Sequence, residues 1–220
     1  MKSVSLFFVL IAAIGLIFPA DAFACACCST PNTYSDSTTK ADAYKLEVLG
    51  EIKFDKAAFL NMTDFAFANI KGLGDMKKDE DLDQWDTPAD FDLANSFAAK
   101  TWKFDLKTKT GTNGSLTLPM PLQMKQFYVD IHDSSDGGTG PSLYKEWRFK
   151  GNVTTGTGIF KSSVIKPSSY FLVLQGRGNN CDNASDFTHW RLEITNKKAD
   201  YVFYGKLSSG VNQAETNAAR

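Results

Sequence analysis

Residues 190–195 read Trp-Arg-Leu-Glu-Ile-Thr, so large apolar side chains alternate with polar ones. An alternation of period two predicts a β-strand with one face buried and the other in contact with water. Residues 201–204 (YVFY) follow the polar stretch 196–200, and we expect the two segments to pair as a hairpin. Residues 170–174 (YFLVL) are apolar on both sides, which predicts a central strand of the same sheet.

The same alternation recurs along most of the chain. Its apolar members are Tyr44, Leu46, Val48, Ile52 and Phe54, then Trp102, Phe104 and Leu106, then Phe127, Val129 and Ile131, and finally Trp147 and Phe149. A helix is expected only over residues 88–99, where Thr87 suits the N-cap and Pro88 the first helical position. About ten short strands with few helices predict an all-β fold, an antiparallel β-sandwich or barrel.

The composition is that of a folded and nearly neutral protein. The 220 residues include 24 Lys and Arg and 25 Asp and Glu, for a formal net charge of −1, and 43% are hydrophobic. This balance favours a globular domain and argues against the broad basic surface that is typical of nucleic-acid-binding proteins. The sequence also lacks a P-loop, a helix-opening G-x-G-x-x-G and a G-x-S-x-G motif. We therefore expect neither a nucleic-acid partner nor a nucleotide cofactor.

Residues 1–24 have the features of a cleaved secretion signal. Lys2 precedes the apolar residues 6–18, which are too few to cross a bilayer comfortably, and residues 22–24 (Ala-Phe-Ala) fit a signal-peptidase site. Cleavage would leave Cys25 as the first mature residue, and the mature protein is expected to be secreted or periplasmic without a membrane span. The alternatives are an uncleaved anchor helix and a lipid anchor at Cys25, although the preceding Phe is bulky for a lipidation site.

These patterns divide the chain into four expected parts. They are a signal peptide over 1–24, a flexible Cys-rich arm or linker over 25–43, a β domain over 44–207 and a disordered polar tail over 208–220. The arm is expected because residues 29–42 are rich in Ser, Thr and Asp and lack an apolar period.

Three of the four cysteines lie within residues 25–28 (Cys-Ala-Cys-Cys), and the fourth is Cys181. Any complete pairing closes one very small ring inside the cluster, and such a ring adds little stability. Three interpretations stay open: a disulfide that ties the arm to Cys181, a soft-metal site, and a redox dithiol of Cys25 and Cys28. Ser29 follows Cys28, so the C-x-x-C-H motif of covalent haem attachment is not formed.

The soft-metal interpretation predicts thiolate ligands for copper or zinc at Cys25, Cys27 and Cys28, with Cys181 as a possible fourth. His189 is the further candidate ligand, because it follows Cys181 at the start of the next strand. If Trp190 points into the core, however, His189 lies on the opposite face. The spacing matches no zinc-finger pattern, and the alternative is an ordinary surface histidine.

Other polar and aromatic clusters give weaker signals. Residues 79–83 begin like a calcium loop but lack the required Gly and Glu, and His132 lies among acidic residues that could bind a divalent ion. Trp85, Tyr128 and Tyr144 are expected to be exposed, where aromatic rings can stack on sugars.

Soft-metal binding at the cell envelope is the function that the sequence favours. No catalytic residue is assigned, and an enzyme is not expected. The first alternative is a non-catalytic module that binds a carbohydrate or a protein partner and has purely structural cysteines. The second alternative is a thiol oxidoreductase.

Overall fold

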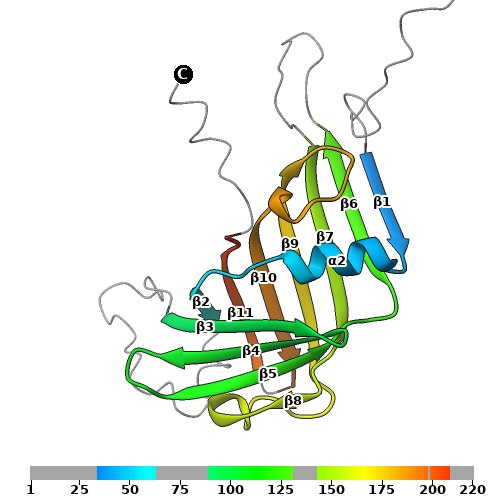
Figure 1. The fold of residues 1–220 in the computed structure, drawn as a ribbon. Helices are drawn as coiled ribbons and strands as arrows, with labels where there is room; N and C mark the ends of the chain where they lie inside the picture. The colour runs from blue at the N-terminus through cyan, green and yellow to red at the C-terminus, as the bar shows by residue number, and fades with distance from the viewer. Residues whose placement is uncertain (1–33, 63–88, 131–142, 198, 209–220) are drawn as a thin grey trace, which may run out of the picture.

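The described residues form a bent β-sheet, and the helix α2 (Ala43–Glu51) lies across it (Figure 1). A computed structural model describes residues 34–62, 89–130, 143–197 and 199–208. Within these residues eleven strands form one antiparallel sheet, in the order β1-β6-β7-β9-β10-β11-β2-β3-β4-β5-β8. The predicted all-β antiparallel fold class is therefore confirmed.

The described elements have the following bounds. The strands are β1 (Tyr34–Thr39), β2 (Ala57–Met62), β3 (Ala89–Ala98), β4 (Thr101–Thr108), β5 (Asn113–Pro119), β6 (Met124–Asp130), β7 (Leu143–Asn152), β8 (Thr155–Gly156), β9 (Ser169–Gly178), β10 (Phe187–Asn196) and β11 (Ala199–Lys206). The helical elements are α2 (Ala43–Glu51) and the short 3-10 helices η3 (Gly158–Phe160) and η4 (Ala184–Asp186).

The sheet bends so that its two halves enclose the core. In Figure 1, β3, β4 and β5 cross in front of the lower parts of the upright strands β9 and β10. Aromatic rings join the two halves: Phe104 of β4 lies 5.6 Å from Trp190 of β10, and Trp102 of β4 lies 4.9 Å from Phe149 of β7, measured between ring centroids. All four side chains are buried. The inner faces of both halves therefore share one hydrophobic core.

Alternation correctly predicts the central strands. Trp190, Leu192 and Ile194 of β10 are buried, and β10 pairs with β11 in a hairpin that begins with the pair Asn196 and Ala199. β9 lies between β7 and β10, as the doubly apolar residues 170–174 predict. These central strands support the candidate site that is described below.

The prediction of a strand over residues 44–54 is wrong, because most of this segment forms α2. Asp42 caps the helix by accepting a hydrogen bond from the Lys45 amide at 2.8 Å. Val48, Leu49 and Ile52 are buried, and their spacing of three and four residues is that of one helical face, whereas the adjacent pair Val48 and Leu49 does not fit an alternation of period two. Among the described residues no helix is long and apolar enough to cross a membrane.

The prediction of a helix over residues 88–99 is also wrong, because β3 occupies residues 89–98. Phe91 and Leu93 are buried at a spacing of two, and β3 pairs with both β2 and β4. In the segment expected to be a linker, residues 34–39 form the edge strand β1, which pairs with β6. The signal segment 1–24 and the tail from 209 onwards lie outside the described residues.

Candidate functional site

The strand β6 presents its polar side chains to the inside of the sheet. Gln126 and Asp130 are buried and Tyr128 is half-buried, whereas Phe127 is on the outer face beside Tyr34. The sequence predicts the opposite orientation, with Phe127 and Val129 facing the core. The inversion is possible because the loop after β9 supplies polar partners for Gln126 and Tyr128 on the inner face.

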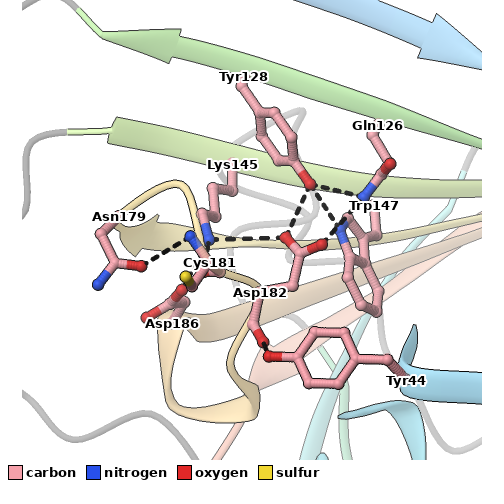
Figure 2. A network of polar contacts seen from close by, with 9 residues as sticks. All are labelled: Tyr44, Gln126, Tyr128, Lys145, Trp147, Asn179, Cys181, Asp182 and Asp186. Carbon is pink, nitrogen blue, oxygen red and sulfur yellow. Dashed lines mark hydrogen bonds and ion pairs between the residues drawn. The ribbon is translucent and has the colours of Figure 1, made fainter. Parts of the chain in front are cut away.

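A buried lysine lies at the centre of these polar groups (Figure 2). Lys145 of β7 has 0% exposure, and it shares the inner face with Trp147. Its Nζ lies 2.7 Å from Asp186 Oδ2 and 3.6 Å from Asp182 Oδ1, and it donates a hydrogen bond of 2.6 Å to the Cys181 carbonyl. The ammonium is therefore neutralised by two carboxylates of one loop, as burial of a charge requires.

Asp182 connects this ion pair to β6 and β7. Tyr128 Oη donates to Asp182 Oδ1 at 2.8 Å, and Gln126 Nε2 donates to Asp182 Oδ2 at 3.3 Å. Trp147 Nε1 donates to Tyr128 Oη at 3.2 Å. Burial, reinforced by the nearby Asp182 carboxylate, raises the pKa of Tyr128 well above its usual value. We call Gln126, Tyr128, Lys145, Trp147, Asp182 and Asp186 the Lys145 network.

The Lys145 network holds residues 179–186 against the sheet. Two glycines of β9 permit the close approach: a Cβ on Gly176 would lie 1.8 Å from the Asp186 carbonyl oxygen, and one on Gly178 would lie 2.2 Å from the Asp186 carboxyl carbon. Asn179 accepts a hydrogen bond from the Cys181 amide at 2.9 Å. Tyr44 of α2 donates a hydrogen bond to the Asp182 carbonyl, so the loop is also fixed to the helix.

A groove of about 490 Å³ lies between α2 and this loop. Its lining includes three carboxylates and one ammonium, from Glu47, Glu51, Asp182 and Lys53. Tyr44, Glu47 and Glu51 follow one another on one face of α2, and Val48 and Ala184 add apolar surface. We call this surface the acidic groove. Because Asp182 belongs to both, the Lys145 network fixes one of its walls.

Two of the residues predicted to bind metal, Cys181 and His189, lie within the described part of the chain. The carbonyl of Cys181 contacts Lys145 on the inner face, whereas His189 is exposed on the outer face with Nδ1 2.9 Å from Thr188 Oγ1. Cys25, Cys27 and Cys28 lie outside the described residues. In the part of the chain that is described, no three His, Cys, Asp or Glu residues are grouped to hold a metal ion.

The other candidate groups are resolved only in part. Tyr128 is half-buried inside the sheet, and Tyr144 on the outer face donates a hydrogen bond of 2.5 Å to Glu146. His132, Trp85 and the acidic residues 79–83 lie outside the described residues.

The Lys145 network was not predicted from the sequence, because its residues lie far apart in the chain and none of them stands out by itself. Lys145 is an ordinary member of an alternating strand, although it has the parity of Trp147, and that parity could have placed it on the inner face. Asp182 and Asp186 look like typical loop residues. Their meeting with Lys145 depends on the pairing of β7 with β9.

Comparison of the chain with family models, curated proteins and solved structures finds no match.

Proposed function

We propose that this protein is an exported, non-catalytic binding module, and that the acidic groove takes a small organic amine. The observation that carries this proposal is the excess of negative charge at the groove. Glu47 and Glu51 face a single lining ammonium, that of Lys53, whereas the third lining carboxylate, Asp182, is already paired with Lys145 in the network that fixes one wall. A rigid wall lowers the entropy cost of binding.

The helix adds to the negative potential of the groove. Glu47 and Glu51 are four residues apart on α2, where like charges repel by a few tenths of a kcal/mol. Glu51 also ends the helix, at the negative end of its dipole, and the last turn of α2 contains no basic residue. A bound ammonium relieves both interactions, while the apolar Val48 and Ala184 can contact its hydrocarbon part.

Spermidine is a suitable probe for the acidic groove. We expect isothermal titration calorimetry to show spermidine binding that weakens with added salt, and no binding of triethylene glycol, a neutral chain of similar length. Removing two carboxylates in Glu47→Gln/Glu51→Gln should raise the Kd about tenfold, since each exposed ion pair contributes up to about 1 kcal/mol.

Glu193→Gln on the outer face of β10 is the matched control and should leave the Kd unchanged. Equal affinity of the wild type and the double variant would place the amine elsewhere and contradict the proposal, as would the absence of binding by the wild type.

We further infer that Cys181 forms a disulfide with one cysteine of residues 25–28. Support comes from the bonded state of Cys181 and from the absence of other cysteines in the sequence. Such a bond closes a long loop and ties the arm to the wall of the acidic groove.

Non-reducing peptide mapping tests this pairing and soft-metal binding together. We expect a peptide that contains Cys181 to be joined to the one that contains residues 25–28. The two remaining cysteines of that cluster are then the ligands for copper or zinc, and Cu(I) titration against a competing chelator should lose its tight phase in Cys27→Ser/Cys28→Ser. If all four cysteines are oxidised in the exported protein, soft-metal binding is contradicted.

A further inference from the structure

The contact between Lys145 and Asp186 brings an amine and a carboxyl group together away from water. Lys145 has 0% exposure, and the Asp186 side chain only 12%. Their closest atoms, Nζ and Oδ2, are 2.7 Å apart, so the carboxyl carbon is one bond beyond the contact. Fixed proximity of this kind can replace a large part of the barrier of a reaction between two groups.

The surrounding backbone leaves Asp186 little freedom to move away. Its carboxyl group is packed against Gly178 and its carbonyl against Gly176, so β9 confines it from one side. Nζ is held by the Cys181 carbonyl at 2.6 Å. The two reacting groups are thus fixed from β7, β9 and the loop before β10.

The environment favours neutral species over separated charges. Trp147 packs against Phe187, which follows Asp186, with ring centroids 4.9 Å apart. The Tyr128 ring lies 5.7 Å from Lys145 Nζ. In such a site the charged pair of Lys145 and Asp186 carries a desolvation cost that the neutral amide lacks, while Asp182 keeps its hydrogen bonds from Tyr128 and Gln126 after the reaction. Asp182 Oδ1, 3.6 Å from Nζ, is positioned to accept and return a proton.

We propose that Lys145 and Asp186 form an intramolecular isopeptide bond. Nζ gives one proton to the Asp186 carboxylate, and the neutral amine attacks the Asp186 carboxyl carbon. The nitrogen then passes a second proton to Asp182. The new N–C bond forms, the C–O bond breaks, and the oxygen leaves as water with the proton returned by Asp182. An ammonium and a carboxylate become one amide and one water, with no oxidant or reductant. The remaining N–H stays directed at the Cys181 carbonyl.

Peptide mapping of the reduced and denatured protein tests the bond. We expect the Lys145 peptide to be recovered joined to the Asp186 peptide, at the sum of the two masses less one water. Amine-reactive labelling after denaturation should leave Lys145 unmodified. Recovery of separate, unmodified peptides and a labelled Lys145 would overturn the proposal.

Lys145→Arg is the matched control, because arginine keeps the cation near both carboxylates but does not form this amide. Its two peptides should be separate. A succinimide at Asp136-Gly137 would also lose one water, but it would persist in Lys145→Arg and would not join two peptides. Joined peptides that persist in Lys145→Arg would contradict the bond. Asp182→Asn should lower the cross-linked fraction, whereas complete cross-linking in that variant overturns the role of Asp182 in proton transfer.

Discussion

Replacement of Lys145 by methionine should lower the free energy of unfolding by about 3–5 kcal/mol. The methionine side chain is similar in length but leaves Asp182 and Asp186 without a cation at a site where Lys145 had 0% exposure. An uncompensated buried carboxylate is costly because water cannot replace the lost partner. The loss is expected to be larger still where the amide bond to Asp186 has formed.

Urea denaturation followed by circular dichroism measures this loss. Lys150→Met is the matched control, because Lys150 lies on the same strand with an exposed side chain and should change stability by less than about 0.5 kcal/mol. A similar small change in Lys145→Met would mean that the carboxylates find other partners. In that case the Lys145 network would not fix the wall of the acidic groove.

The sequence predicts the sheet well where one face of a strand is uniformly apolar. Trp190, Leu192 and Ile194 repeat at a spacing of two and are all buried, and this pattern does not also fit one face of a helix. Strand β6 shows where this reasoning ends. Phe127 is the more apolar neighbour, but Gln126 turns inward because Asp182, 56 positions later, supplies its partner. A local pattern contains no information about a partner so distant in sequence.

The two wrong elements have a different cause. In residues 44–54 a helical and an alternating pattern share members such as Val48 and Ile52, and the Asp42 cap and tertiary packing select the helix. In residues 88–99 the Thr-Pro start favoured a helix, whereas pairing with β2 and β4 favours a strand. The acidic groove depends on the helix in the first of these segments, because an α-helix is needed to place Glu47 and Glu51 on one face.

Replacement of Phe104 by alanine should lower the free energy of unfolding by about 3–5 kcal/mol, because it opens a cavity where the halves of the sheet meet. Phe104 has 0% exposure. Its ring centroid lies 5.4 Å from that of Phe54 and 5.6 Å from that of Trp190. Since β4 and β10 belong to opposite halves, the lost contacts weaken the whole core rather than one strand.

Urea denaturation monitored by tryptophan fluorescence and by far-UV circular dichroism checks this expectation. The two signals should shift together, since one core spans both halves. Tyr204→Ala is the control: its ring stacks on Phe59 at 5.6 Å but is 37% exposed, and its loss should cost only about 1 kcal/mol. If Phe104→Ala costs no more than Tyr204→Ala, or if the fluorescence change separates from the loss of strand structure, the two halves fold independently.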